Sequence, residues 1–332
     1  MRHVSSPFAR RIETRIENRT ETRIAIVGST ASGKSAVGLA VVRALSAAGR
    51  AVEIVSMDSM AVYRGMDVGT AKPSAADRAG TPHHLIDVVD PDTEFAVGEF
   101  QRLALAAIEG IEARGAVPVL VGGTGLYVDA VVGELTIPGR YPDVRAGLEA
   151  EARNSPGGLY ARLLEVDPVA ASRMEPTNDR RIVRALEVTI GAGRPFSSFG
   201  PGLAASQNPG RYRMVGIARN RATLPARLAA RFERQMADGF LEEARTLLEC
   251  YNDRLSRTAG QALGYRELWA HLHGRGGTLD DAVAEAVLRT RQFAVRQERW
   301  FRRDARIRWL DGESLEPEAL AAEVVVGFGS PR

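Results

Sequence analysis

The segment Gly28-Ser-Thr-Ala-Ser-Gly-Lys-Ser35 is a complete G-x-x-x-x-G-K-S motif. Its glycines let the loop wrap so that backbone amides point at phosphate oxygens, while Lys34 adds a positive charge and the Ser35 hydroxyl can ligate magnesium. The only other lysine in the chain is Lys72, so a chance match to this motif is rare. The motif therefore predicts a site for a diphosphate or triphosphate group rather than a plain glycine-rich turn.

Two further side chains could act on a group held by this loop. Asp58 follows the apolar run 51–56, and Thr124 lies in the glycine-rich turn that follows the run 117–121. At the carboxyl end of a strand, Asp58 would face the loop and could serve as a general base or as a partner of magnesium. The alternatives from the residues alone are a helix N-cap for Asp58 and a capping hydroxyl for Thr124.

The other motifs in the chain argue against two common classes of P-loop protein, the switch-type GTPases and the conventional ATPases. The chain has no N-K-x-D motif, with which switch-type GTPases read the base. A conventional ATPase would place a magnesium-linked Asp at the end of a downstream apolar strand, but the run 117–121 ends in Gly122-Gly-Thr-Gly125.

The elements that must hold these residues alternate between strands and helices. Short β-branched runs predict strands at 23–27, 51–56, 117–121 and 213–218, with helices at 35–48 and 100–114 between them. This alternation predicts an α/β fold: a P-loop NTPase-like parallel sheet flanked by helices, with ligands at the carboxyl ends of the strands. After the sheet, long helices are expected at 224–238, 241–251, 260–274 and 279–303.

Strand signals disappear after Pro138, and short helical patterns follow at 143–154, 159–166, 168–174 and 179–190. We therefore predict an all-helical insertion domain. The expected organisation is a polar extension at 1–22, a core formed by 23–138 and 205–312, the insertion at 139–204 and a C-terminal tail at 313–332.

Composition limits the remaining classes. The chain has 332 residues, of which 45% are hydrophobic and 26% charged, which is typical of a protein with a sizeable core. A single cysteine excludes an internal disulfide. There is no apolar run of the roughly 20 residues that span a bilayer and no secretory signal, so we expect a cytoplasmic protein without membrane association. We also expect a monomer.

Basic residues concentrate in the last third of the chain. Between Arg211 and Arg308 there are 20 arginines against 12 Asp and Glu. The stretch Arg289 to Arg303, with interleaved aromatic residues, predicts contact with a polyanion, either a diphosphate or an RNA backbone. The alternative is a solvated helix face whose aromatics pack inward.

Nine blocks of the sequence resemble bacterial tRNA dimethylallyltransferases in the order found in that family. They are GSTASGKS (28–35), SMDSMAVYRGMDVGTAKP (56–73), PHHLID (82–87), FAVGEFQRLA (95–104), VGGTGLYVDA (121–130), NDRRIVRALEV (178–188), GFLEEARTLL (239–248), QALGYREL (261–268) and TRQFAVRQERWFRR (290–303). The family transfers a dimethylallyl group from its diphosphate to the exocyclic amine of the adenine 3′ of the anticodon in tRNA. The chain departs from it in having Ala61 where a glutamine is frequent.

The resemblance implies two substrates and a role for each candidate residue. Dimethylallyl diphosphate would be held, with Mg²⁺ on Ser35, by Gly28, Ser29, Thr30, Ala31, Ser32, Gly33, Lys34 and Ser35. Asp58 would be the catalytic base, and Thr124 would bond near the target amine. The tRNA anticodon stem-loop would contact Asp58, Ser59, Met60, Ala61, Thr124, Arg145, Arg180, Arg181, Ile182, Val183 and Arg184. Helical spacing puts Arg180 and Arg184 on one face, whereas a solvated position is the alternative for Arg181.

Two other functions stay open at this point. An isopentenyltransferase acting on free adenine nucleotide would not need the helical insertion or the cluster from Arg180 to Arg184. A small-molecule kinase would bind an adenine nucleotide as phosphate donor. The insertion and the basic helices favour the tRNA enzyme.

Overall fold

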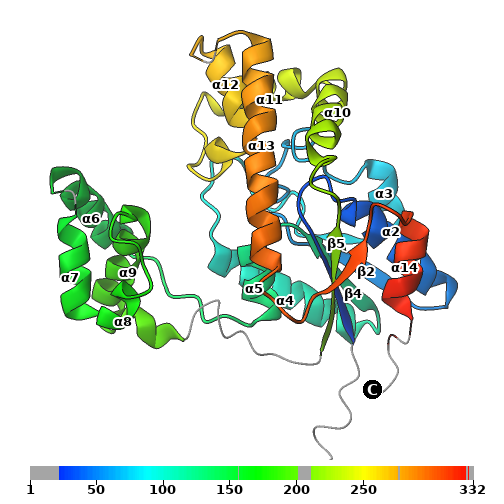
Figure 1. The fold of residues 1–332 in the computed structure, drawn as a ribbon, viewed down its shortest axis with the longest axis horizontal. Coiled ribbons are helices and arrows are strands. Elements are labelled where there is room, and N and C mark those ends of the chain that lie inside the picture. Colours follow the sequence, from blue (N-terminus) through cyan, green and yellow to red (C-terminus); the bar gives the residue numbers. More distant parts are fainter. Residues whose placement is uncertain (1–21, 156, 201–210, 276, 327, 329–332) are drawn as a thin grey trace, which may run out of the picture. The chain divides into compact units, whose positions relative to one another are not determined.

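The computed structural model describes residues 22–155, 157–200, 211–275, 277–326 and 328 (Figure 1). These residues form two compact units. One consists of the described residues up to Val128 and from Arg211 onward, and the other begins at Asp129. Except for Thr22, the predicted N-terminal extension lies outside the described residues.

The first unit is built on a six-stranded sheet in which every pair is parallel. Its strands are β1 (Arg23–Val27), β2 (Val52–Ser56), β3 (His83–His84), β4 (Val117–Gly122), β5 (Tyr212–Ala218) and β6 (Arg308–Asp311), in the order β3-β2-β4-β1-β5-β6. Strand β1 lies in the interior of the sheet between β4 and β5, and in open parallel sheets ligands bind beyond the carboxyl ends of the strands. The predicted P-loop NTPase-like parallel sheet is confirmed.

Helices cover both faces of this sheet (Figure 1). On one face, α2 (Lys34–Ala47) packs with α14 (Pro317–Val325) over apolar side chains such as Ile24 and Val119. On the other face lie α4 (Val97–Ala113) and α5 (Gly125–Val132), whose Phe100 and Tyr127 rings are 4.0 Å apart between centroids.

The end of the chain differs from the prediction of a tail at 313–332. Helix α14 buries Leu320, Ala321 and Val324 in the core beside α2. Their i, i+1, i+4 spacing gives the short helix one apolar face, and that face completes the cover of the sheet.

Four helices stand beyond the carboxyl end of the sheet (Figure 1). They are α10 (Leu224–Ala237), α11 (Phe240–Tyr251), α12 (Tyr265–Leu272) and α13 (Leu279–Phe301). Two shorter elements of the first unit are α3 (Ala75–Gly80) and the 3₁₀ turn η3 (Ala259–Gln261). Helix α13 begins with a capping box formed by Thr278 and Asp281, and it packs against α10 and α12. Its last turns lie against the turn after β4, where a Cβ on Gly125 would lie 2.3 Å from the Trp300 ring.

The second unit contains only helices among its described residues. They are α6 (Pro142–Asn154), α7 (Gly158–Val166), α8 (Pro168–Ala171), α9 (Asp179–Ala192) and the 3₁₀ turn η1 (Phe196–Phe199). Their apolar faces share a core that includes Leu148, Leu163 and Leu186. The unit starts at Asp129, within α5, which is earlier than the predicted boundary at residue 139.

Candidate active site

The G-x-x-x-x-G-K-S loop joins β1 to α2 at the carboxyl edge of the sheet. Gly33 has φ +87°, a left-handed conformation that turns the chain into the helix, and a Cβ there would lie 3.2 Å from the Arg219 guanidinium. The loop thus leads directly into the N-terminus of α2, where the first amides of a helix favour a bound phosphate.

Lys34 is half-buried beside this loop, and its Nζ donates to the Ser29 carbonyl at 3.3 Å. Burial lowers the pKa of Lys34 to about 8, although the nearby Asp58 carboxylate raises it, and the positive charge of Arg231 lowers it further. A lysine with such a low pKa lacks a full counter-charge, so an anion bound here would stabilise its protonated form.

The pKa of Lys34 leads to a pH prediction. Only protonated Lys34 attracts an anion, so the affinity for inorganic diphosphate should fall as the pH rises through about 8, by about tenfold per pH unit. Calorimetric titrations between about pH 7 and pH 9 would measure this slope. Diphosphate itself titrates in this range, so the Lys34→Met variant is the control, and the same slope in both proteins would contradict the prediction.

Asp58 follows β2 and closes a turn. Its Oδ1 accepts from the Met60 amide at 2.8 Å and from the Ala61 amide at 3.4 Å. These bonds fix one carboxylate oxygen and show that a capping role for Asp58 is real, in a turn rather than at a helix. Both bonds use Oδ1, so the second oxygen of the carboxylate can still accept a proton or bind a metal.

The turn that carries Asp58 is joined to the turn after β4. Thr124 Oγ1 accepts from the Ser59 amide at 3.1 Å and donates to Ser59 Oγ at 3.3 Å. The backbones come so close that a Cβ on Gly122 would lie 2.2 Å from the Met57 carbonyl oxygen. Glycine is therefore required at residue 122, and Thr124 and Asp58 belong to one rigid edge.

Arg231 on α10 is a site residue that the sequence analysis missed. Its Nη1 donates to Thr30 Oγ1 in the loop at 3.0 Å. Burial lowers the pKa of Arg231, while the negative charge of Asp58 raises it. Two cations, Lys34 at the end of the loop and Arg231 on α10, therefore lie near the carboxylate of Asp58. Among 42 arginines, no local signal in the sequence marks this one.

Gln297 on α13, also missed, connects the loop to the turn after β4. It is 7% exposed; its Oε1 accepts from the Thr30 amide at 2.8 Å and its Nε2 donates to the Gly123 carbonyl at 2.7 Å. A buried amide side chain satisfied at both ends holds the two backbone segments in register.

We expect Gln297→Leu to lower kcat/KM about tenfold, because it leaves the Thr30 amide and the Gly123 carbonyl without these partners. Steady-state kinetics and thermal unfolding would measure the effect. Gln292→Leu, at an exposed site on the same helix, is the control. A variant with wild-type kinetics would show that the bridge does not matter for the site.

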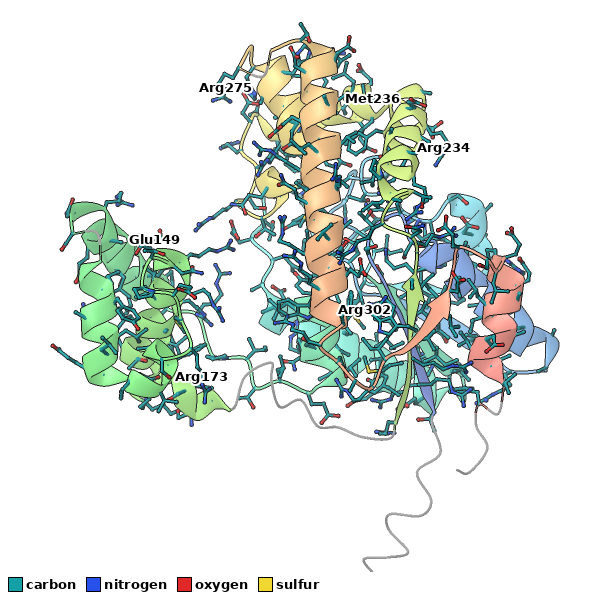
Figure 2. All side chains as sticks on the ribbon, in the orientation of Figure 1. Glu149, Arg173, Arg234, Met236, Arg275 and Arg302 are labelled. Carbon is teal, nitrogen blue, oxygen red and sulfur yellow. The ribbon has the colours of Figure 1, made fainter. Side chains whose placement is uncertain are left out.

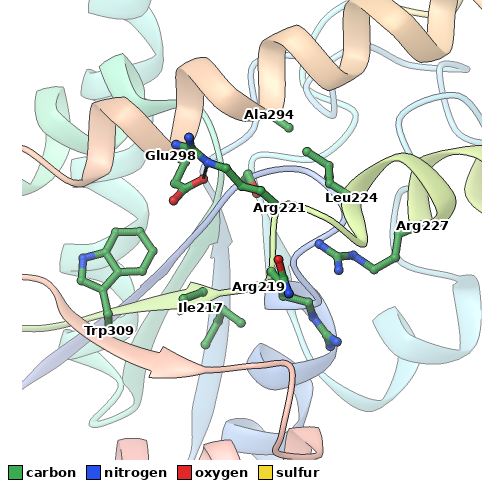
Figure 3. Close-up of a pocket in the computed structure, with 11 residues that line it drawn as sticks. Ile217, Arg219, Arg221, Leu224, Arg227, Ala294, Glu298 and Trp309 are labelled. Carbon is green, nitrogen blue, oxygen red and sulfur yellow. Dashed lines mark hydrogen bonds and ion pairs between the residues drawn. The ribbon is translucent and has the colours of Figure 1, made fainter.

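A pocket opens beside the loop, between β5, α10 and α13 (Figure 3). Its wall includes Arg219, whose Nε donates to the Ser32 carbonyl at 3.0 Å, as well as Arg221 and Arg227. Arg221 pairs with Glu298 at 2.9 Å and Arg227 with Glu313 at 3.3 Å. The pocket thus combines apolar side chains such as Leu224 and Trp309 with arginines, two of which are paired with carboxylates of the protein.

The basic stretch at the end of α13 combines packing with exposure. Arg296 stacks on Phe293, and the Arg303 guanidinium lies 4.6 Å from the centroid of the Trp300 ring. Arg289, in contrast, pairs with Glu267 and Glu285. Both interpretations of this stretch, a polyanion contact and a solvated face, are compatible with these contacts.

The predicted tRNA contacts divide into accessible and buried residues. Ser59 and Met60 are partly exposed, but Ala61 is 5% exposed and packs inward. On α9, Ile182 and Val183 lie in the core of the second unit. This corrects the prediction for the side chains of Ala61, Ile182 and Val183, because the apolar face of a helix or turn is used for packing.

Of the four arginines of the second unit that were predicted to contact tRNA, two are exposed and two are bonded to a buried carboxylate. Arg180 and Arg181 are exposed on the first turn of α9. Arg145 and Arg184 are each about one quarter exposed, and both bond to the buried carboxylate of Glu187. The structure thus brings together Arg145 and Arg184, which lie on different helices.

The sheet, its strand order and the loop between β1 and α2 define the class of this protein as P-loop NTPase-like. Within that class, the turn with Asp58 and the glycine-rich turn with Thr124 at the ends of β2 and β4 are the distinguishing parts.

Comparison with known proteins gives the family. Residues 61–304 match the family model described as IPP transferase, and the chain belongs to this family. A tRNA dimethylallyltransferase of Kineococcus radiotolerans is 47% identical over 306 residues, which cover 91% of this chain and 95% of that protein. One from Pelotomaculum thermopropionicum is 42% identical over 312 residues, which cover 93% and 96%. The resemblance found in the sequence is confirmed.

Solved structures of such transferases are also similar to this chain. The tRNA isopentenylpyrophosphate transferase of Bacillus halodurans has a TM-score of 0.65 at 36% identity and covers 92% of this chain and 94% of its own. A eukaryotic dimethylallyltransferase described as acting on tRNA has a TM-score of 0.73 at 26% identity, covering 89% and 75%.

Proposed function

We propose that this protein transfers a dimethylallyl group from dimethylallyl diphosphate to the exocyclic amine of the adenine 3′ of the anticodon in tRNA. The observation that carries the proposal is the placement of three groups at one edge of the sheet. Two are the cations beside the phosphate-binding loop, Lys34 and Arg231, and the third is the carboxylate of Asp58. A nucleotide hydrolase would need neither the turn with Asp58 nor the inserted helical unit.

On the donor side, the bond between the allylic carbon and the diphosphate oxygen breaks, and negative charge develops on the leaving diphosphate. Lys34, Arg231 and the backbone amides at the start of α2 would hold that charge. Such donors accelerate the reaction because they are in place before the charge appears.

The donor set also fits Mg²⁺. Ser35 is exposed at the first turn of α2, and the Asp58 carboxylate, in the turn after β2, lies near Lys34. Magnesium prefers oxygen ligands and is commonly shared between one or two protein groups and substrate phosphates. When bound, it would help neutralise the leaving diphosphate.

On the acceptor side, the exocyclic amine is a poor nucleophile because its lone pair is delocalised into the ring. As the nitrogen bonds to the allylic carbon, the second oxygen of Asp58 would take its proton. The Thr124 and Ser59 hydroxyls, already bonded to each other, would orient the amine beside Asp58.

The adenine must leave the stacked loop to reach this edge, which requires the protein to hold the RNA on either side of it. Arg145, Arg180, Arg181 and Arg184 of the second unit would supply contacts to the phosphate backbone. We expect the enzyme to act as a monomer in the cytoplasm. No helix in the described part of the chain is long and apolar enough to cross a membrane.

The deciding experiment supplies purified protein with Mg²⁺, dimethylallyl diphosphate and either unmodified tRNA or AMP, followed by mass analysis of the nucleosides. We expect a five-carbon unit on one adenine of tRNA and none on AMP. Addition to AMP alone would identify a nucleotide isopentenyltransferase. Phosphate transfer from ATP to a small molecule, without prenylation, would identify a kinase.

A further inference from the structure

Glu187 is a buried carboxylate on the apolar side of α9. Its exposed fraction is 1%, and its neighbours along the helix, Leu186 and Val188, are fully buried. An isolated carboxylate in such a place is costly, so its partners must explain its presence.

Those partners are two arginines from different helices. Glu187 Oε1 accepts from Arg184 Nη1 at 2.8 Å and Oε2 accepts from Arg145 Nη1 at 3.1 Å. Oε1 also accepts from the Tyr141 amide at 2.9 Å. One carboxylate therefore holds both guanidinium groups as well as the start of α6.

Further bonds restrict Arg184 to a single orientation. Its Nη1 donates to the Gly139 carbonyl at 3.1 Å and its Nη2 to the Pro138 carbonyl at 2.9 Å. Arg145 in turn donates from Nε to Glu149 at 2.8 Å. Both arginines keep about one quarter of their side-chain surface exposed, so they are fixed but can still be reached from solvent.

We infer that Glu187 is a positioning residue for RNA binding, holding Arg145 and Arg184 in place before the RNA arrives. The inference rests on the proposed function, in which these arginines contact tRNA. Preorganisation matters because a free arginine loses side-chain entropy when it binds a phosphate, whereas a fixed one has already lost it on folding.

The sign of the effect separates positioning from charge alone. Removing a carboxylate near an RNA surface makes the potential more positive, so electrostatics alone predicts tighter RNA binding for Glu187→Gln. Positioning predicts weaker binding, because the amide group can accept from only one of its two ends, so one arginine loses its bond to residue 187 and is held less firmly.

The test measures binding of unmodified tRNA to the full chain at several salt concentrations. Glu187→Gln should weaken binding about fivefold, give a shallower salt dependence, and raise KM for tRNA with little change in kcat. The matched control is Glu165→Gln, which removes an exposed carboxylate of α7 outside this network and should bind as tightly as wild type or slightly more so. Unchanged or tighter binding by Glu187→Gln would overturn the inference.

Two further variants keep the outcomes distinct. If thermal unfolding shows that Glu187→Gln is not folded, Arg184→Lys is tested in its place. Lysine keeps the charge, but its single nitrogen cannot reach all three acceptors of Arg184. Wild-type affinity of Arg184→Lys for tRNA would overturn the inference. Arg180→Ala tests the proposed RNA surface outside this network. Loss of affinity in Arg180→Ala with none in the Glu187 and Arg184 variants would refute the positioning role and leave the proposed function standing.

Discussion

Asp58→Asn is expected to reduce kcat for dimethylallyl transfer about a thousandfold while the Kd for tRNA stays within about twofold of wild type. Asparagine keeps an oxygen that can accept from the Met60 amide, so the turn after β2 should remain intact. It removes the negative charge and the proton acceptor. Single-turnover assays with saturating tRNA and donor would measure the loss.

The same variant separates the two chemical roles open to Asp58. If the carboxylate acts as the base, the affinity for inorganic diphosphate in the presence of Mg²⁺ should change little. A large loss of Mg²⁺-dependent diphosphate affinity would indicate a metal partner instead. Equal losses of tRNA binding and turnover would contradict the base assignment. Asp92→Asn, at an exposed site, is the control for removing a carboxylate.

Arg231→Gln should lower kcat/KM by about a hundredfold with an unchanged Kd for tRNA. Glutamine can still bond to Thr30 Oγ1, but the positive charge beside the loop, which we propose stabilises the departing diphosphate, is lost. We expect the affinity for inorganic diphosphate to fall in parallel, as measured by calorimetry. Arg231 would then be a donor-side residue.

The control for this variant lies on the same helix. Arg234 is exposed on α10 (Figure 2), and its charge acts on Arg231. Arg234→Gln should leave kcat/KM within about twofold of wild type, because an exposed charge is screened by solvent. Similar losses in both variants would mean that the general basic charge of α10 matters and that Arg231 has no specific role.

The fold and the centre of the candidate site could be predicted because their signals are local. The motif from Gly28 to Ser35 occupies consecutive residues, and the strands that flank it are short apolar runs. Asp58 and Thr124 were predicted to lie near the loop because the carboxyl ends of parallel strands meet at one edge. Their side chains indeed lie at that edge, and their turns are joined through Ser59.

Other parts of the site depend on residues far apart in the chain. Gln297 reaches Thr30 across 267 positions, and Arg231 reaches the same residue across 201. Each sits on an amphipathic helix where many polar residues simply face water. Nothing in the local pattern distinguishes the one that turns toward the loop.

The sequence by itself determined the type of sheet, the phosphate-binding loop and the carboxylate beside it, since consecutive residues encode strand, turn and helix. Only the tertiary structure decided which arginine approaches the loop, that the last helix covers the sheet, and that Ile182 and Val183 are core residues. It also decided that Glu187 holds Arg145 and Arg184. The physical reason is that pairing and burial depend on which surfaces meet after the helices pack, and this is a property of the whole chain.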